Sequence, residues 1–466
     1  MVSILGANSV SGGYEVSNSL RFNDGDSPDL DITSADGNED IWTWSAWIKR
    51  STLKSSGEQF LFCGSSNGTT NTEIKLQNDQ FTYINYNGSS NNSYIRTNAK
   101  LRDTSAWYHL VCSIDMSQST DTNRIKLYIN GVHQTSLDQT TYASQNTDTY
   151  MNVNSGTHRI GADARTASNY FDGYMTEIHF VDGTAKAQTD FGEFNDNAVW
   201  IPKKYTGTYG TNGFFMQFKQ TGTSANSSGI GADTSGNDKH YTPANLAATD
   251  VTTDTCTNNF ATLNALNFQT SSALSEGNTK IVGVNADQFL SSSSIGVDEG
   301  KWYVEAKLIA LSGGQAQFGI TSDASEQNRN NRWVGQDSYS YGLASNDGLY
   351  NNASTVTYSN ATYTTNDIIS IALDLDNNLI YFYKNGTVMN SGTGYSITDP
   401  ASTTNGFYFF AVSDGNSDYN ATWEMNFGNP PFSISSGNTD GKYGNFEYAP
   451  PSGYYALCTK RLAEFG

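Results

Sequence analysis

Apolar and polar side chains alternate along short segments of this chain. In Trp42–Arg50, apolar residues fall at every second position from Trp42 to Ile48, so they share one face of a strand. Trp47 lies on the opposite, mostly polar face. Similar segments before residue 205 are Ser19–Asn23, Gln59–Cys63, Gln80–Tyr86, Trp107–Asp115, Asn123–Asn130, His158–Gly161 and Tyr170–Asp182. Turns rich in Asn, Gly and Ser separate them at intervals of roughly 8–12 residues, which predicts an antiparallel sandwich.

The alternation stops near Trp200–Tyr205 and resumes at Cys256. Between these points, residues 206–255 are rich in small and polar side chains, with one apolar burst at Gly213–Phe218. A structureless loop of this length is unusual, so we interpret residues 206–255 as a partly ordered connector whose phenylalanines pin it to a sandwich. The strand patterns of the second block are Lys301–Ile309, Ala316–Thr321, Tyr339–Leu343, Ile368–Asp374, Leu379–Lys384, Gly406–Ser413 and Ala421–Phe427.

These patterns predict an all-β fold of two antiparallel β-sandwiches joined by the connector. The predicted parts are an N-terminal docking arm at residues 1–17, a first sandwich at 18–205, the connector at 206–255 and a second sandwich at 256–466. Asn130-Gly131 and Asn385-Gly386 each predict a tight hairpin, because a type I′ turn needs a positive φ at both central residues.

Composition narrows the function classes. Only 15% of the 466 residues are charged, while Tyr and Phe number 28 and 23, a balance that favours strands. The formal net charge of −20 argues against nucleic acid and against anionic membrane surfaces as partners. No apolar run is long enough to span a bilayer, so we expect no membrane insertion. The segment Met1–Val16 lacks the basic and apolar regions of a secretory signal peptide.

Both blocks resemble known domain families. In the first, WTWSAWIKR (42–50), WYHLVCSID (107–115), NRIKLYINGV (123–132) and RIGADARTASNYFDGYMTEIHFVDGT (159–184) follow one another in order. Residues 18–185 thereby resemble the laminin G / concanavalin A-like lectin–glucanase family, which implies a jelly-roll sandwich. In the second, GKWYVEAKL (300–308), DIISIALDLDNNLIYFYKNG (367–386) and MNFGNPPF (425–432) stand out. Residues 298–432 thereby resemble a SPRY (B30.2-type) domain.

The joining segments carry a further resemblance. FGEFNDNAVWIPKKYTGTYGTNGFFMQF (191–218), DTCTNNFATLNAL (254–266) and APPSGYYALCTKRL (449–462) are similar to virion-associated proteins of tailed phages. The resemblance implies a non-enzymatic virion structural protein: a tail fibre, spike or adhesin that attaches to a host-surface glycan or receptor. We then expect synthesis in the host cytoplasm, display on the particle surface, other virion proteins as partners and a homo-oligomer, with a trimer favoured. The alternative is a capsid decoration protein that binds only neighbouring virion subunits.

A glycan hydrolase is the weaker alternative, because the concanavalin-like family includes glucanases. Retaining hydrolysis needs two carboxyl groups close together, which the glucanase branch supplies as Glu-x-Asp-x-Glu on one strand. No glutamate of this chain is followed two residues later by aspartate. The chain also has no His-x-x-x-His or Cys-x-x-Cys motif. We therefore predict no catalytic residues, no zinc site and no enzymatic activity. His109 and His179, set among aromatic residues in strand patterns, are interpreted as structural.

Candidate binding residues follow from loop composition. Lectin sites combine an aromatic ring for stacking with Asp or Asn hydrogen bonds; the candidates are Tyr86, Tyr94 and Tyr170 in the first block and Trp333, Asp337, Tyr339 and Tyr350 in the second. The laminin G resemblance also implies Ca²⁺ as the one candidate cofactor, held by oxygen ligands at the loop rim, with Asp24, Asp26, Asp163 and Asp172 as candidates. The competing interpretations are ordinary turn residues and a solvated acidic surface.

The four cysteines are too few for a disulfide scaffold. Cys63 and Cys112 lie among apolar neighbours and are predicted to be small core residues. Cys256 opens the second block and Cys458 follows its last strand. Because the ends of a domain often lie close together, we predict that Cys256 and Cys458 are neighbours and candidates for a disulfide bond.

Overall fold

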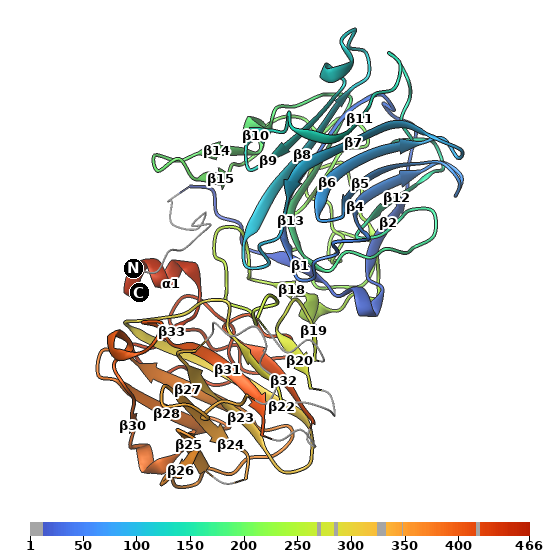
Figure 1. The fold of residues 1–466 in the computed structure, drawn as a ribbon. Coiled ribbons are helices and arrows are strands. Elements are labelled where there is room, and N and C mark those ends of the chain that lie inside the picture. Colours follow the sequence, from blue (N-terminus) through green and yellow to red (C-terminus); the bar gives the residue numbers. More distant parts are fainter. Residues whose placement is uncertain (1–12, 268–271, 284–287, 324–331, 347, 416–419) are drawn as a thin grey trace. The chain divides into compact units, whose positions relative to one another are not determined.

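The computed structural model describes residues 13–267, 272–283, 288–323, 332–346, 348–415 and 420–466 (Figure 1). The described chain forms two compact units, one ending at Asn258 and the other running from Asn259 to Gly466. Strands dominate both units, so the prediction of an all-β chain built from two antiparallel sandwiches is confirmed. None of the helices in these ranges is long and apolar enough to cross a membrane.

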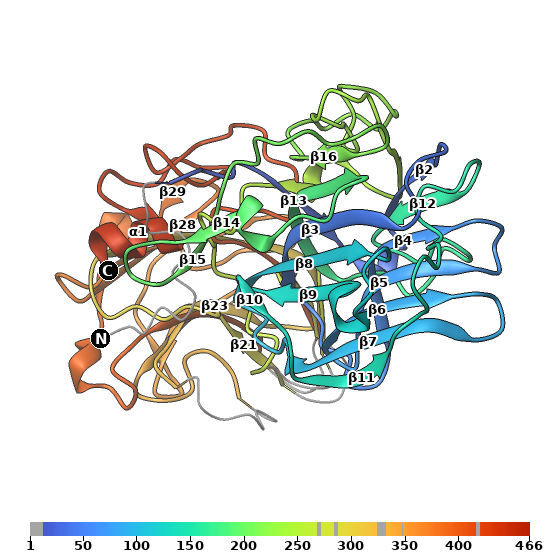
Figure 2. The same cartoon turned by 90° about the horizontal axis from the view of Figure 1, so that it is seen from above.

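The N-terminal unit is a sandwich of two antiparallel sheets (Figure 2). The first sheet has the order β10-β9-β8-β3-β13-β1-β18, and β16 also pairs with β13. Its strands are β10 (Val132–His133), β9 (Ile125–Ile129), β8 (Trp107–Asp115), β3 (Ile41–Arg50), β13 (Gly173–Asp182), β1 (Ser19–Phe22), β18 (Val251–Thr252) and β16 (Phe214–Met216). The second sheet has the order β11 (Leu137–Thr141), β7 (Asn91–Lys100), β6 (Gln80–Tyr86), β5 (Asn71–Gln77), β4 (Glu58–Ser65), β12 (Thr157–Ile160), β2 (Asp29–Thr33) and β17 (Thr242–Ala244).

Strand β3 explains how the core of this unit forms. Trp42, Trp44, Ala46 and Ile48 point between the two sheets and are fully buried, as their spacing predicts. The other face of β3 is buried as well. Trp47 packs there with Trp107, Tyr174 and Trp200, in a cluster that also includes Val16 and Cys256. The first sheet is therefore covered on both faces, by the second sheet on one side and by chain segments on the other.

The segment after residue 205 belongs to this first sandwich, so the prediction of a separate connector at residues 206–255 is wrong. Strand β16 pairs with β13, β17 with β2 and β18 with β1. The segment belongs to the sandwich because Phe214 and Phe218 are buried in its main core. The sequence pattern predicts only that these phenylalanines attach a connector to a sandwich. The two units meet between residues 258 and 259. The sequence pattern predicts that the first sandwich ends at residue 205 and that the second begins at residue 256.

The predicted docking arm, residues 1–17, falls mostly outside the described residues. Its described end packs on the first sheet, because Val16 is buried and its backbone N–H donates to the Thr257 hydroxyl at 3.1 Å. Residues 13–17 thus form part of the N-terminal unit.

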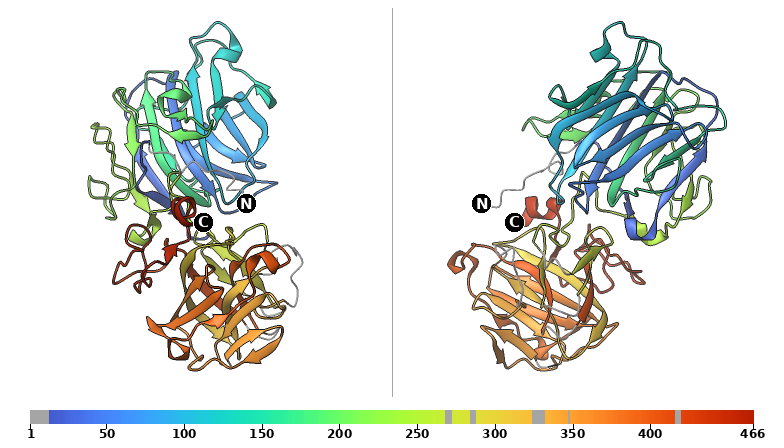
Figure 3. Two further views of the ribbon diagram at one scale, coloured as in Figure 1. Left: turned by 90° about the vertical axis from the view of Figure 1, so that its left-hand side faces the viewer. Right: turned by 45° about the vertical axis from the view of Figure 1, so that its right-hand side comes forward.

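The C-terminal unit is a second sandwich (Figure 3). One sheet has the order β19 (Ala273–Ser275), β20 (Lys280–Val282), β32 (Asn420–Asn426), β22 (Lys301–Ser312), β27 (Ile368–Asp374), β28 (Leu379–Lys384) and β29 (Thr387–Val388), with β30 (Tyr395–Ser396) beside β28 and β33 (Tyr455–Ala456) beside β22. The other has the order β21 (Leu290–Ser292), β31 (Phe409–Asp414), β23 (Ala316–Thr321), β24 (Ser340–Ala344), β25 (Gly348–Asn351) and β26 (Ser354–Val356). Trp302, Phe318, Ile371 and Trp423 are central to its buried core.

Local turns and one helix complete the fold. Asn130 and Gly131 have φ values of 47° and 78°, and Asn385 and Gly386 have 48° and 77°, which confirms both predicted hairpins. A short helix, α1 (Thr459–Phe465), follows β33 and was not predicted. Arg461 on this helix binds both carboxylate oxygens of Asp440 at 2.7 and 2.8 Å, which fixes the helix to the preceding loop. A short hairpin, β14 (Gly192–Phe194) with β15 (Trp200–Pro202), extends the N-terminal unit.

Candidate ligand pocket at the bulge of strand β13

Strand β13 changes partner in its middle. Residues 173–175 pair with β1, whereas residues 178–180 pair with β16 on the same edge. Its register against β3 shifts between Thr176 and His179, so the strand contains a bulge there. Glu177, inside the bulge, has a φ of 49°, in the left-handed region that a glutamate rarely adopts. Bulges and such backbone conformations gather at functional sites because they redirect a side chain.

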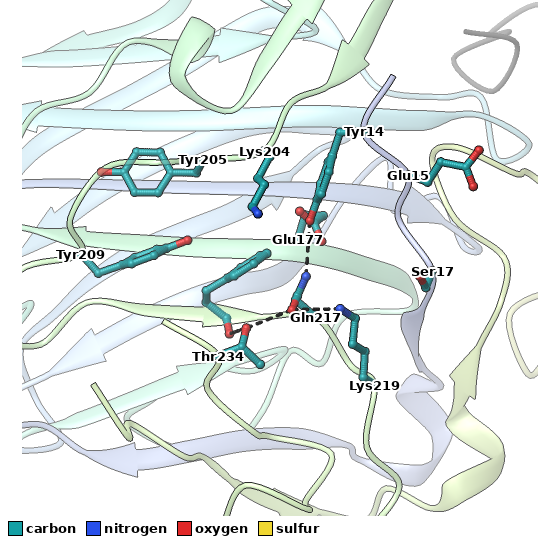
Figure 4. Close-up of a pocket in the computed structure, with 11 residues that line it drawn as sticks. Tyr14, Glu15, Ser17, Glu177, Lys204, Tyr205, Tyr209, Gln217, Lys219 and Thr234 are labelled. Carbon is teal, nitrogen blue, oxygen red and sulfur yellow. Dashed lines mark hydrogen bonds between the residues drawn. The ribbon is translucent and has the colours of Figure 1, made fainter. Parts of the chain in front are cut away.

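A pocket of about 360 Å³ opens beside this bulge (Figure 4). This volume lies near the lower end of the range for small-ligand sites, ~300–1,000 Å³. Four aromatic side chains line it, and seven polar ones complete the wall. The aromatic residues are Tyr14, Tyr205, Tyr209 and Phe215; the polar ones are Glu15, Ser17, Glu177, Lys204, Gln217, Lys219 and Thr234. The N-terminal segment, β13 and the segment after residue 203 therefore build one site.

The aromatic wall is held from behind by His179. The imidazole stacks on Phe215 with a centroid distance of 4.1 Å, and its Nδ1 forms a 2.8 Å hydrogen bond with the Tyr209 hydroxyl. Tyr209 in turn contacts Tyr205 edge to face at 5.0 Å. The structural role predicted for His179 matches these contacts. Because each ring touches the next, the wall is a preorganised surface on which a flat apolar ligand face can stack.

The tyrosine hydroxyls of the pocket are neutral. Burial raises the pKa of Tyr205 to about 12, with a smaller contribution from the charge of Asp190. Burial, followed by the nearby charge of Glu177, raises the pKa values of both Tyr14 and Tyr209 well above their ordinary value of 10. Each phenol therefore keeps its proton at neutral pH, and the Tyr205 hydroxyl donates to the backbone carbonyl of Thr208 at 2.9 Å.

The polar wall is a short hydrogen-bonded chain. Gln217 Nε2 donates to the Tyr14 hydroxyl at 3.3 Å, and Gln217 Oε1 accepts from Lys219 Nζ and from the Thr234 hydroxyl, both at 3.2 Å. Glu177, only 4% exposed, lies next to Tyr14 at the floor of the pocket. Figure 4 shows Lys204 pointing inward beside Glu177, whereas the carboxylate of Glu15 points away. The pocket thus offers aromatic faces, acceptors and two ammonium groups to one ligand.

The three candidate tyrosines of the first block lie elsewhere. Tyr86 has the Arg165 guanidinium over its ring, with its carbon 5.7 Å from the ring centroid. The Tyr94 hydroxyl donates to Gln77 Oε1 at 2.6 Å, and the Tyr170 hydroxyl donates to a backbone carbonyl of its own loop. None of the three lines the pocket. Each is engaged in a contact within the unit instead.

Two of the candidates in the second block do come together. The Trp333 and Tyr350 rings meet at right angles with centroids 5.2 Å apart. Asp337 Oδ1 accepts the backbone N–H of Tyr339 at 3.0 Å, so these two residues form a local turn. Burial raises the pKa of Tyr408 most, and smaller contributions from Tyr341, Asp337 and Tyr339 place Asp337 and Tyr339 near that ring.

The four candidate calcium ligands are not brought together, and the prediction of a site built from them is corrected. Asp24 forms an ion pair with Lys54 at 3.1 Å, and Asp163 forms one with Arg165 at 2.8 Å. Asp26 accepts from the Asn23 amide at 2.7 Å, and Asp172 accepts from the Thr52 hydroxyl. Across the ranges that the structure covers, no three His, Cys, Asp or Glu side chains gather in a group that could hold a metal ion.

The predicted bond between Cys256 and Cys458 is not formed. Both residues are buried as thiols, and they belong to different units. Cys256 packs with Trp47 and Trp107 in the N-terminal unit, whereas Cys458 packs with Phe260 and Tyr303 in the C-terminal unit. Residue 256 therefore ends the first sandwich and does not open the second. Cys63 and Cys112 are fully buried, which confirms their prediction as core residues.

The pocket itself was missed. Its residues are spread from position 14 to position 234, and no short motif links them. One signal was present in the sequence, because Glu177 interrupts a strand pattern that is mostly apolar. Burying a carboxylate costs free energy unless it has hydrogen-bond or charge partners, so its presence there indicates a specific role. The backbone bulge that directs this side chain has no signature in the residue pattern.

Each of the two sandwiches matches the model of a known domain family. Residues 24–189 match the concanavalin A-like lectin/glucanase superfamily, and residues 301–430 match the SPRY domain. A search of curated proteins finds no match.

Solved structures similar to this chain include the SPRY domain of human HERC1, with 15% identity over 35% of this chain and 96% of that one and a TM-score of 0.28. Stonustoxin is similar with 17% identity over 36% of this chain and 27% of that one and a TM-score of 0.27. The PSpry domain of TRIM65 has 13% identity over 36% of this chain and 88% of that one, also with a TM-score of 0.27. The family matches show that the chain carries a concanavalin A-like domain followed by a SPRY domain.

Proposed function

We propose that this protein is a non-catalytic attachment protein that binds a glycan in the pocket beside the β13 bulge. The observation that carries the proposal is the combination of stacked aromatic rings with neutral hydroxyl, amide and carboxylate groups in one pocket. Sugars present an apolar ring face and a rim of hydroxyls, and such a pocket complements both. Domains of both matched families are typically non-catalytic binding domains.

The carboxylates of the pocket support binding over hydrolysis. Glycoside hydrolysis uses two carboxyl groups that flank the scissile bond, commonly about 5–9.5 Å apart. Among the pocket-lining residues, Glu177 and Glu15 are the two carboxylates, and Glu15 points away from the interior (Figure 4). Glu177 is left as a hydrogen-bond acceptor for ligand hydroxyls.

The proposal extends to the setting of the protein. We propose that it lies on the particle surface of a tailed phage, as a tail fibre, spike or adhesin. It would form a homo-oligomer and would bind other virion proteins. The resemblance of residues 191–218, 254–266 and 449–462 to virion-associated proteins supports this setting. Antibody labelling of purified particles and sedimentation of the isolated protein test the location and the oligomer. Absence of the protein from particles would overturn the setting.

The test of attachment is binding of the purified chain to an oligosaccharide array, followed by calorimetry on the best ligand. Changing Gln217→Ala removes the amide that links Tyr14, Lys219 and Thr234, and should weaken binding about tenfold or more. The matched control is Tyr86→Ala, which alters a sequence-predicted site outside the pocket and should leave binding unchanged. An equal loss in both variants, or no binding by folded protein, would contradict the proposal.

A second candidate function, decoration by contact with neighbouring virion subunits, is favoured by one observation. Phe194 and Val132 are 54% and 55% exposed. The Phe194 ring lies 4.9 Å from that of Trp200, and the backbone of Gly131, next to Val132, packs closely on the same indole. Exposed apolar side chains of this kind can anchor a protein interface. If the double variant Phe194→Ser/Val132→Ser lost incorporation into particles while glycan binding persisted, this role would be supported.

A further inference from the structure

Among the described residues, seven lysines outside the pocket each form an ion pair with a carboxylate. Lys49, Lys75 and Lys301 each lie within 3 Å of a carboxylate oxygen. The same kind of pairing is found for Lys54, Lys203, Lys280 and Lys384. Lys204 and Lys219 line the pocket, and neither forms an ion pair with a described residue.

The surroundings of these two ammonium groups point to an anionic ligand group. Lys219 Nζ donates to the neutral amide oxygen of Gln217 at 3.2 Å, which leaves its charge uncompensated. Lys204 is exposed and its side chain points into the pocket (Figure 4). The titratable groups facing them are Glu177, Tyr14, Tyr205 and Tyr209. The tyrosines are neutral, and Glu177 is buried at the floor beside Tyr14.

From this arrangement, and resting on the proposed glycan binding, we infer that the pocket selects an acidic sugar. The ring hydroxyls of the sugar would donate to Glu177 at the floor, and one ring face would stack on the aromatic wall. The anionic substituent would lie toward Lys204 and Lys219 on the polar side. An ammonium group is a compact point charge that does not distinguish the shape of an anion. A carboxylate, as in a hexuronic acid, and a sulfate ester therefore share the required chemistry.

The experiment compares matched short oligosaccharides by calorimetry with the full chain. The probes are an oligogalacturonate, the same oligosaccharide after chemical reduction of its carboxyl groups to alcohols, and a sulfated galactan oligosaccharide. Short probes are used because the net charge of −20 repels a long polyanion. We expect binding of at least one acidic probe and a loss of about tenfold or more after carboxyl reduction. The oligogalacturonate and sulfated arms identify which anionic group is recognised.

Lysine variants then locate the anion. Lys204→Ala and Lys219→Ala should each weaken binding of the acidic probe by a much larger factor than binding of the reduced probe. The matched control is Lys203→Ala, because Lys203 is the adjacent residue, pairs with Glu193 at 3.6 Å and does not line the pocket. Equal affinity for the acidic and reduced probes would overturn the acidic selectivity and leave glycan binding intact. Failure of all probes, neutral and acidic, would overturn the proposed function as well.

Discussion

The carboxylate of Glu305 accepts a 2.8 Å hydrogen bond from the backbone N–H of Tyr448, which lies 143 residues further along the chain. The same carboxylate accepts from the backbone N–H of Glu447 at 3.0 Å and from the Asn426 amide at 2.9 Å. The Tyr303 hydroxyl is also within 3.2 Å. One buried side chain on β22 therefore fixes the segment that leads to β33 and α1.

The stability of the C-terminal unit should fall as the pH rises from 5 to 8. Burial raises the pKa of Glu305 from 4.5 to about 7, although its hydrogen bonds lower it. Burial likewise raises the pKa of Asp414 to about 7. A raised pKa in the folded state means that folding binds protons, so this stabilisation is complete below the unfolded pKa and disappears above 7. Glu305 alone should contribute on the order of 3 kcal/mol across this window.

Hydrogen exchange of peptides from β22 and β32, measured at several pH values under conditions of global opening, would follow this change. In the double variant Glu305→Gln/Asp414→Asn the slope between pH 5 and 8 should be much smaller, even if the variant is less stable overall. A free energy of unfolding that rises with pH in the unaltered protein would show the prediction to be wrong.

Removing one partner of the buried ion pair between Lys49 and Asp254 should strongly destabilise the N-terminal unit. The two groups are 2.9 Å apart, both side chains are at most 1% exposed, and Trp107 Nε1 also donates to Asp254. Asp254→Ala removes the buried carboxylate that faces the Lys49 ammonium group, and breaking a buried ion pair in this way typically costs about 3–5 kcal/mol. Urea denaturation monitored by tryptophan fluorescence gives the measurement.

The control for that prediction is the half-exposed pair Lys54 and Asp24, 3.1 Å apart. Asp24→Ala should change the free energy of unfolding by less than about 1 kcal/mol, because such pairs are largely solvated. If both aspartate variants lose similar amounts, burial of the Lys49 pair does not determine its contribution.

A fragment ending at residue 258 should fold, whereas one ending at residue 205 should not. The shorter fragment lacks β16, β17 and β18, so β13, β2 and β1 each lose a hydrogen-bonded neighbour. It also lacks Phe214, Met216 and Phe218 from the core. Exposed strand edges and core side chains favour aggregation. A single cooperative thermal transition at the same temperature in both fragments would refute this expectation.

All four cysteines should be inert in the native protein. Cys63, Cys112, Cys256 and Cys458 are buried, and burial raises the pKa of the first three thiols. Because the thiolate is the reactive form, a thiol reagent should label none of them before denaturation and all four afterwards. A reducing agent should leave the melting temperature unchanged. A drop in melting temperature on reduction would reveal a disulfide bond.

Much of the sandwich architecture could be predicted because alternation is a local property. The faces of β3, the two tight Asn-Gly hairpins and the paired sandwiches all follow from residues close in sequence. Trp47 shows the limit of this reasoning. Its face was interpreted as mostly polar, yet it is buried because Trp200 and Val16, distant in sequence, pack over it.

The pocket and the true domain boundary depend on contacts between distant segments. Composition suggested a linker after residue 205, since Gly, Ser and Asn dominate there, but three short strands within it find partners in the first sandwich. Asp233 illustrates how: its carboxylate accepts from the backbone N–H groups of Phe215, Ser235 and Lys239 and thereby orders a polar loop. No periodicity marks such a loop as structured, and none marks the bulge at Glu177.

The pairing of β18 with β1 sets an order of events during synthesis. Ser19 and Leu20 pair with Thr252 and Val251. Strand β1 is among the first strands to leave the ribosome, and it can pair with β18 only after one of the last strands of its unit has been synthesised. At roughly 5–20 residues per second, this delay is on the order of 10–50 seconds. Until then the free edge of β1 needs protection, for example by a chaperone. Once Asn258 has emerged the first sandwich can close, so it can be complete before most of the SPRY domain has been translated.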